Sequence, residues 1–272
     1  MKKELIAQRN PKSPIAEMFR TLRTNIQFMN SKKDLKTILV TSTMPGEGKS
    51  WVSSNLAITF AQSGKRVCLV DADMRKGRLA ALFQTDVVPG LTNYLSGIDN
   101  KGITENADIL RYIRPTEVDN LFLIPAGNVP PNPAELLQTD RTIQMIEKLK
   151  EIFDVIILDG TPAMLVTDAL IISRIVDTTF IVASHKSTKK DDLQKIKKSI
   201  ENVGGKIAGV VLNRKPVKAK EYSTSYYYGN SSNSKNRHGK IDKDDYTTES
   251  SISKEKQEDI LSQLNSYLNN KD

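Results

Sequence analysis

The residues best suited to chemistry form a phosphate-binding loop early in the chain. The loop reads Ser42-Thr43-Met44-Pro45-Gly46-Glu47-Gly48-Lys49-Ser50. Gly46 and Gly48 let backbone N–H groups close around phosphate oxygens, Lys49 can reach the β- and γ-phosphates, and the Ser50 hydroxyl can bind Mg²⁺. Thr43 stands where such loops usually carry their first glycine. An apolar run precedes the loop and a helical pattern follows it, so the segment has the strand–loop–helix context of a nucleotide site.

Two further motifs place carboxylates directly after apolar runs. Asp71 and Asp73 belong to an Asp-x-Asp-x-Arg motif that ends at Arg75, and Asp159 follows a separate apolar run. Because the carboxyl ends of parallel strands meet at one edge of a sheet, we expect the three aspartates to converge beside the phosphate loop. Such a set can coordinate Mg²⁺ and activate an attacking oxygen. The sequence therefore predicts phosphoryl transfer.

These motifs need a sheet to position them. Short apolar runs predict strands at 37–41, 67–70, 121–124, 155–158, 179–182 and 207–212. Helical patterns predict helices at 49–63, 134–150, 167–175 and 189–203. Near-continuous apolar character indicates that both faces of the sheet are covered. The fold class predicted is α/β, with a doubly wound, mainly parallel sheet flanked by helices, as in P-loop nucleotide-binding proteins.

The chain divides into three parts by composition. Residues 1–36 form a basic N-terminal segment, for which the family resemblance given below implies a helical oligomerisation role, and residues 37–216 are predicted to form an ATP-binding domain. Residues 217–272 have few aliphatic side chains over most of their length and are rich in Ser, Asn, Tyr and Lys, so we expect a flexible tail. No apolar run approaches the about 20 residues that span a bilayer. The single cysteine, Cys68, excludes an internal disulfide and fits a reducing cytoplasm.

The net charge of +8 is unevenly distributed. Residues 1–36 and 186–220 are strongly basic, whereas residues 37–185 are mildly acidic. Such basic segments suit either nucleic acid or an anionic membrane surface. Solubility and subunit contacts are the favoured interpretation, and no nucleic-acid partner is expected, because few aromatic residues interleave the basic ones.

Taken together, the motifs resemble those of the bacterial tyrosine kinases that control capsule and exopolysaccharide synthesis. Phosphate loop, Asp-x-Asp-x-Arg and strand-end Asp159 are similar to the three Walker-type motifs of that family. Residues 17–23 match its Glu-x-x-Arg-x-x-Arg oligomerisation motif, and residues 127–137 match a segment after the third strand. The family's tyrosine cluster has counterparts in Tyr222, Tyr226, Tyr227 and Tyr228.

The resemblance implies a role for each acidic and basic residue of the motifs. Lys49 would hold the phosphates, and Ser50, Asp73 and Asp159 would act on Mg²⁺, directly or through water. Asp71 would be the base that faces the tyrosine hydroxyl. Arg75 would assist near the phosphates.

The resemblance also implies nucleotide-binding and assembly residues. Those expected to bind the nucleotide are Pro45, Gly46, Glu47, Gly48, Lys49, Ser50, Trp51 and Asn213. Asn213 matches an adenine-contacting residue of related ATPases, and a turn residue is an equally good interpretation. Glu17, Arg20 and Arg23 would contact a neighbouring subunit, since the two arginines lie on one helix face.

Two features depart from the family pattern. The family usually reads Asp-Thr-Pro-Pro where this chain reads Asp159-Gly160-Thr161-Pro162, so the Asp is retained and the local loop geometry differs. Trp51 is also unusual directly after the phosphate loop, where it could slow nucleotide entry.

The biological setting also follows from the resemblance. The kinase would be cytoplasmic, recruited to the inner face of the membrane by a separate membrane-bound activator of polysaccharide synthesis. It would assemble as a ring in which one subunit's tail enters the neighbour's site and is phosphorylated there. A cognate tyrosine phosphatase would reverse the modification.

Two other functions compete with the kinase hypothesis. A partition- or division-type ATPase switch would hydrolyse ATP without phosphorylating protein, but such ATPases usually carry an extra lysine where this chain has Met44. A regulatory subunit of a polysaccharide export complex would bind nucleotide without catalysis. Labelled ATP and Mg²⁺ discriminate among the three, because only the kinase yields phosphotyrosine.

Overall fold

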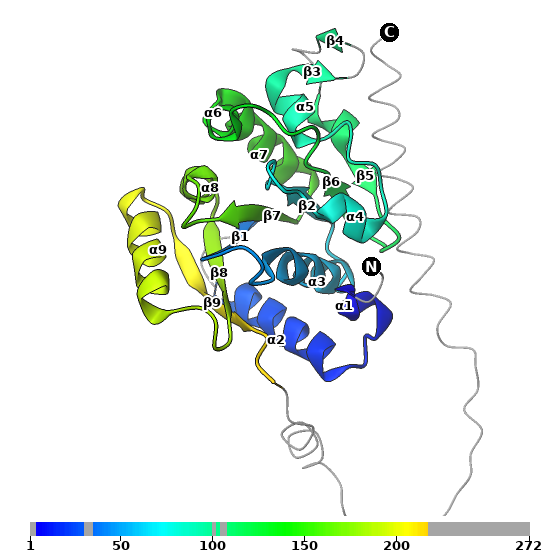
Figure 1. The fold of residues 1–272 in the computed structure, drawn as a ribbon. Helices are drawn as coiled ribbons and strands as arrows, with labels where there is room; N and C mark the ends of the chain where they lie inside the picture. Colours follow the sequence, from blue (N-terminus) through cyan, green and yellow to red (C-terminus); the bar gives the residue numbers. More distant parts are fainter. Residues whose placement is uncertain (1–3, 30–34, 100–101, 104–107, 217–272) are drawn as a thin grey trace, which may run out of the picture.

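A seven-stranded sheet forms the centre of the molecule in a computed structural model that describes residues 4–29, 35–99, 102–103 and 108–216 (Figure 1). The strands are β1 (Thr37–Ser42), β2 (Val67–Asp71), β5 (Arg114–Pro115), β6 (Leu121–Ile124), β7 (Val155–Pro162), β8 (Thr178–Ser184) and β9 (Ile207–Asn213). Their order is β5-β6-β2-β7-β1-β8-β9, and all neighbours are parallel except β5 and β6. The six predicted strands are therefore confirmed, and β5 is an antiparallel addition at one edge.

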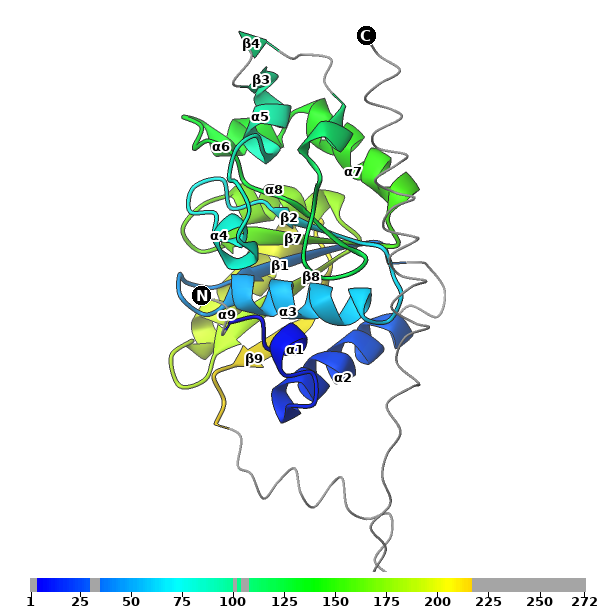
Figure 2. The same ribbon diagram turned by 90° about the vertical axis from the view of Figure 1, so that its right-hand side faces the viewer.

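Helices cover both faces of this sheet. On one face lie α1 (Ile6–Arg9), α2 (Pro14–Phe28), α3 (Lys49–Ala61) and α4 (Leu79–Phe83). The other face packs against α5 (Leu91–Ser96), α6 (Pro133–Leu137), α7 (Asp140–Ile152), α8 (Asp168–Ile175), α9 (Lys190–Asn202) and the 3₁₀ helix Ile109–Tyr112. Figure 2 shows α3 against the sheet with α1 and α2 beneath it, and α7 and α8 on the opposite side. A separate hairpin pairs β3 (Ile98–Asp99) with β4 (Gly102–Ile103). The predicted doubly wound α/β fold is confirmed.

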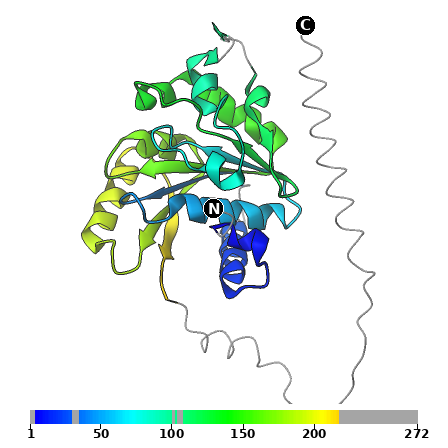
Figure 3. The ribbon, with the colours of Figure 1, turned by 45° about the vertical axis from the view of Figure 1, so that its right-hand side comes forward.

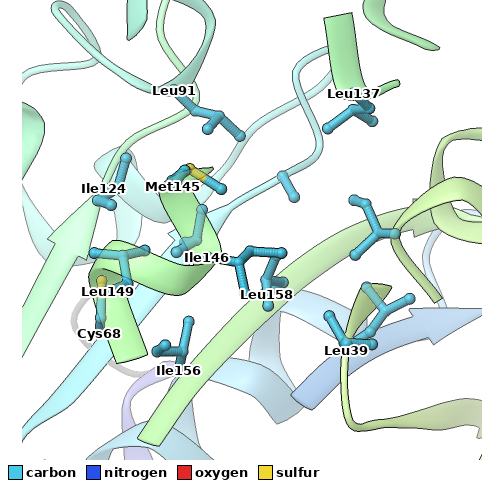
Figure 4. Close-up of a cluster of buried hydrophobic side chains, with 14 of the residues drawn as sticks. Leu39, Cys68, Leu91, Ile124, Leu137, Met145, Ile146, Leu149, Ile156 and Leu158 are labelled. Atoms are coloured by element: carbon cyan, nitrogen blue, oxygen red, sulfur yellow. The ribbon is translucent and has the colours of Figure 1, made fainter. Parts of the chain in front are cut away.

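Alternate residues of each strand supply two hydrophobic cores. In β2, Cys68 and Val70 join the core under α7 and α8, while Val67 and Leu69 join the core under α3. Figure 4 shows part of the first core, where Cys68 lies close to Leu149 of α7. The Cys68 thiol is fully buried, and burial raises its pKa far above the ordinary value. Cys68 therefore acts as a small apolar residue, as the apolar run around it predicts.

One predicted helix is two helices in the structure. The pattern over 134–150 predicts a single helix, but the structure has α6 and α7 separated at Gln138 and Thr139. Thr139 has extended backbone angles and its hydroxyl donates to the Leu136 carbonyl, so it closes one helix and begins the next. Apolar spacing continues across this break, which is why periodicity alone misses it.

The described part of residues 1–36 packs onto the domain through α2. Ser13 caps this helix by accepting from the Ala16 amide at 3.1 Å, and Pro14 occupies the first turn. Phe19 and Ile26 are buried in the core that α3 shares with β1. Figure 3 shows α2 on the far side of α3 from the sheet. Among the described residues, no helix is long and apolar enough to cross a membrane.

Candidate functional site

The phosphate loop lies between β1 and α3 at the carboxyl edge of the sheet, as its sequence predicts. Gly46 and Gly48 have φ values of 81° and 97°, in the left-handed region that favours glycine. A Cβ at Gly48 would also lie 2.1 Å from the Asn213 side-chain nitrogen. Gly48 is therefore required by its backbone angle, and its missing side chain leaves room for the Asn213 amide.

The buried carboxylate of Glu47 holds the loop together. It accepts hydrogen bonds from the Thr43 amide at 2.7 Å, the Thr43 hydroxyl at 2.6 Å and the Met44 amide at 3.0 Å. The Thr188 hydroxyl donates to the same carboxylate, and itself accepts from the Ser184 amide at 2.7 Å. Thr43, which replaces the usual glycine, thus has a defined function as an anchor. No sequence motif includes Thr188, so sequence patterns alone do not identify it.

Asn213, at the end of β9, also contacts the phosphate loop. Its side-chain nitrogen donates to the Glu47 carbonyl at 2.8 Å, and its side-chain oxygen accepts from the Arg214 amide. The residue therefore borders the phosphate loop from the last position of β9. Its contact with adenine stays a prediction.

Lys49 lies among the predicted acidic residues. Its Nζ atom is 2.9 Å from Asp73 Oδ2 and 3.9 Å from Asp159 Oδ2, and the side chain is largely buried. Burial lowers the pKa of Lys49, but the charges of Asp159 and Asp73 outweigh this and raise the pKa above its ordinary value. Lys49 therefore remains charged and is held by carboxylates that a bound nucleotide would have to displace.

Asp71 and Asp159 occupy paired positions on β2 and β7. Asp71 Oδ2 accepts from the Leu79 amide at 2.9 Å, whereas Asp71 Oδ1 and both oxygens of Asp159 are buried without a hydrogen-bond partner. Burial, reinforced by the charge of Asp159, raises the pKa of Asp71 to about 8. Burial likewise raises the pKa of Asp159 and Asp73 adds to the shift, whereas Lys49 and the nearby Ser50 and Ser53 hydroxyls oppose it.

The two unsatisfied oxygens of Asp159 fit a magnesium ion. Buried oxygens without partners are costly, and carboxylate oxygens are the ligands that Mg²⁺ prefers. The described residues contain no cluster of three or more acidic, His or Cys side chains arranged as a complete metal cage. Mg²⁺ does not need such a cage, because it usually keeps several waters and binds one or two carboxylates together with substrate phosphates.

Comparison with known proteins gives a family for this chain. Residues 38–245 match the CobQ/CobB/MinD/ParA nucleotide-binding domain. Tyrosine-protein kinase CpsD of Streptococcus agalactiae serotype III is 42% identical over 199 residues, which cover 73% of this chain and 82% of CpsD. Tyrosine-protein kinase YwqD of Bacillus subtilis is 35% identical over 233 residues, covering 86% and 94% of the two chains. The chain belongs to the bacterial tyrosine kinases.

Solved structures of this kinase family have the same fold. The chimerical protein CapA2B2 superposes with a TM-score of 0.73 at 34% identity, over 79% of this chain and 91% of that one. The kinase domain of Escherichia coli tyrosine kinase ETK gives a TM-score of 0.71 at 31% identity, over 79% and 82%. Both the family and the nucleotide-binding nature of the domain are thereby established.

Arg75 of this kinase binds a residue that the motif does not include. Its Nε and Nη2 atoms donate to the two oxygens of Asp168 at 2.8 and 3.0 Å, and Asp168 is fully buried at the start of α8. From sequence, Asp168 has the pattern of an ordinary acidic residue in the first turn of a helix. The expected contact of Arg75 with phosphates stays a prediction.

The departure after Asp159 has a local explanation. β1 and β7 change register here, because Val40 pairs with Asp159 but Ser42 pairs with Pro162. A Cβ at Gly160 would lie 2.7 Å from Leu39 Cδ1, so the missing side chain lets the core leucine approach β7. Asp159 keeps its place at the site while the following residues bulge.

Trp51 and the oligomerisation motif meet across two helices. The Trp51 ring packs edge-on against Phe19 of α2 at 5.1 Å between centroids, which connects the helix after the phosphate loop with the motif helix. Pro45 lies at the exposed tip of the same loop.

The charged residues of the oligomerisation motif have partners within the chain. Arg20 Nη1 is 2.6 Å from Glu17 Oε2, and Arg20 also donates to the Pro11 carbonyl. Arg23 donates to the Thr59 carbonyl at 2.7 Å. Subunit contacts through Glu17, Arg20 and Arg23 stay a prediction. The predicted acceptors Tyr222, Tyr226, Tyr227 and Tyr228 lie outside the described residues.

Proposed function

We propose that this protein is an ATP- and Mg²⁺-dependent protein-tyrosine kinase that phosphorylates the tyrosines of residues 217–272 in a neighbouring copy. The observation that supports it most is the position of Lys49. Its ammonium group lies beside the phosphate loop, 2.9 Å from Asp73 and 3.9 Å from Asp159, and Asp71 stands on the adjacent strand. A cation for phosphates and a carboxylate for a proton are the two groups that phosphoryl transfer requires.

Phosphate binding is assigned to the loop and Lys49. Backbone N–H groups of Gly46 and Gly48 would surround the phosphates at the positive end of α3. When nucleotide binds, the Lys49 ammonium group would leave Asp73 and contact the β- and γ-phosphates. Its positive charge would then neutralise phosphate charge instead of the Asp73 carboxylate. Mg²⁺, held by Ser50, Asp73 and Asp159 directly or through water, would supply further neutralisation of the phosphate charge.

Asp71 is assigned as the general base. Its Oδ2 atom is fixed by the Leu79 amide, which leaves the buried Oδ1 atom without a partner to receive a proton. The tyrosine oxygen gives its proton to Oδ1 and forms a bond to the γ-phosphorus as the bond from that phosphorus to the bridging oxygen breaks. The products are phosphotyrosine and ADP. A raised pKa makes Asp71 a stronger base once it is ionised.

The remaining assignments concern the rest of the chain and its partners. Trp51 and Asn213 would border the bound nucleotide, residues 1–36 would join subunits into a ring, and residues 37–216 would form the catalytic domain. A membrane-bound activator would recruit this cytoplasmic chain to the membrane for control of capsule or exopolysaccharide synthesis, and a phosphatase would remove the phosphate. These proposals follow from the family resemblance.

Labelled ATP with Mg²⁺ tests the proposed function directly. The wild-type chain, with and without the activator's cytoplasmic segment, should accumulate label on tyrosine. Asp71→Asn should lose transfer while still binding nucleotide, and Asp73→Asn should mainly weaken Mg²⁺-dependent nucleotide binding. Release of inorganic phosphate without phosphotyrosine under every condition would favour the ATPase-switch alternative instead.

A further inference from the structure

Two ion pairs join the segments that carry the acidic residues, one at each end of strands β2 and β7. Before the strands, Arg66 Nη2 lies 3.6 Å from Asp154 Oδ1, and both side chains are more than one-third exposed. After the strands, Arg75 makes two hydrogen bonds, of 2.8 and 3.0 Å, to the fully buried Asp168. The pair beside the site is thus bidentate and has a fully buried carboxylate, whereas its counterpart at the other end is longer and has a partly exposed carboxylate; the two guanidinium groups are equally exposed, at 38%.

The Arg75–Asp168 pair connects two segments that carry candidate magnesium ligands, one with Asp73 and the other with Asp159. Arg75 follows Asp73 by two residues, in a turn where Asp73 Oδ1 accepts from the Lys76 amide and Asp71 Oδ2 accepts from the Leu79 amide. Asp168 begins α8, the helix that follows β7 and its Asp159. Since the turn is tied internally, clamping Arg75 to α8 fixes the whole turn relative to β7.

We propose that Asp168 is a positioning residue, which through Arg75 holds the turn of Asp71 and Asp73 at a set distance from Asp159 and thereby sets the affinity for Mg²⁺-bound nucleotide. The proposal rests on the site assignments of the proposed function. A planar guanidinium paired with both oxygens of a carboxylate allows one relative orientation, so the pair defines geometry as well as distance. Residues that orient metal ligands without contacting the metal typically change metal affinity by about 10- to 100-fold when they are replaced.

Nucleotide binding provides a readout that does not depend on catalysis. Trp51 is the single tryptophan of the chain and follows the loop residue Ser50, so energy transfer from it to a fluorescent ADP analogue reports binding. The variants are Asp168→Asn, Arg75→Gln and the two combined. Each is titrated with the analogue in EDTA and then with Mg²⁺ at fixed analogue concentration.

Both single variants should raise the Mg²⁺ concentration for half-maximal binding about tenfold, with binding in EDTA unchanged. The double variant should show the same loss as either single variant, because each change alone already removes the clamp between the turn and α8. Arg66→Gln and Asp154→Asn, at the opposite end of the same strands, should leave the Mg²⁺ requirement at its wild-type value. Thermal unfolding of every variant checks that the fold is intact.

Two results would overturn the proposal. If Arg75→Gln abolishes phosphoryl transfer at saturating Mg²⁺ while Asp168→Asn keeps wild-type transfer, Arg75 acts on the phosphates directly. If folded variants change only their melting temperature, the pair is structural. A chain that binds Mg²⁺-nucleotide as expected but forms no phosphotyrosine would refute the kinase assignment and leave the positioning role standing.

Discussion

Asp71 and Asp159 are paired across the neighbouring parallel strands β2 and β7, and both carboxyl groups are buried. Burial is the largest cause that raises the pKa of Asp71 to about 8, and the nearby charge of Asp159 is the second largest. Lys49 and the Leu79 amide oppose this shift, and Asp73 adds to it. Each buried carboxyl group therefore resists ionisation in the protein without nucleotide and metal.

This arrangement predicts how stability depends on pH in EDTA without nucleotide. An unfolded Asp ionises near pH 3.9, so the stability contributed by neutral Asp71 is complete below that pH and is lost as pH rises through about 8. Wild-type protein should lose more thermal stability than Asp71→Asn between pH 6 and pH 9. Each kcal/mol corresponds to about 2–4 °C for a chain of this size class. Asp154→Asn, which changes a partly exposed carboxylate, should follow the wild-type curve; parallel curves for all three would contradict the buried-acid interpretation.

Lys49→Met should abolish phosphoryl transfer, with a loss of at least about 10²–10³ in rate, because it removes the cation placed among Asp73 and Asp159. Phosphotyrosine formation from labelled ATP measures it. Lys65→Met, at an exposed position after α3, is the matched control and should retain activity. Near-normal transfer by Lys49→Met would refute the assignment of the site.

Thr188→Val should raise the KM for ATP about tenfold and change kcat less, because the phosphate loop loses a donor to the buried Glu47 carboxylate. Hydrogen bonds to charged groups contribute about 1.5–3 kcal/mol, which matches a change of that size. Thr188→Ser retains the hydroxyl and should bind ATP like wild type. Equal KM values for the Val and Ser variants would show that the Thr188 hydroxyl does not organise the loop.

Sequence patterns predict the sheet well and the long-range contacts of the site poorly. Strands such as β6 and the phosphate loop are recognisable because their signals are local runs of residues. Asp168 and Thr188 are not, because each acquires its role from a partner 93 or 141 residues away. The break between α6 and α7 also escapes prediction, since Thr139 has the spacing of an ordinary polar helix position.

Arg20 and Arg23, changed together to Ala, should reduce the particle mass measured by light scattering. The reason is that guanidinium groups on one helix face can engage carboxylates of a neighbour. Because Arg23 also donates to the Thr59 carbonyl within the chain, circular dichroism must show that the variant remains folded. Arg9→Ala, on the exposed end of α1, serves as the control. An unchanged particle mass for the folded double variant would argue against the subunit contact.

The last prediction concerns the phosphate acceptors, which lie outside the described residues. Tyr226, Tyr227 and Tyr228 should be the main acceptors and Tyr222 a lesser one. Tyr94 and Tyr112 are poor candidates, because they are 7% and 1% exposed and their rings pack together with centroids 5.7 Å apart. Changing Tyr226, Tyr227 and Tyr228 to Phe should therefore lower total phosphotyrosine sharply, as measured by mass spectrometry.

Mixing an inactive chain that has acceptor tyrosines with an active chain that lacks them tests transfer between copies. A Lys49→Met chain with its tyrosines intact should become phosphorylated only when an active chain carrying the three Phe substitutions is added.

Each phosphate adds about −1.5 to −2 charges, so three would make the tyrosine segment strongly anionic and drive it away from a site that already contains Asp71, Asp73 and Asp159. Unphosphorylated chains should then form large assemblies and phosphorylated chains monomers, whereas the triple Phe variant should stay assembled with ATP. Phosphate found mainly on Tyr94 or Tyr112 would contradict this model, because those side chains could reach a site only if the core around them opened.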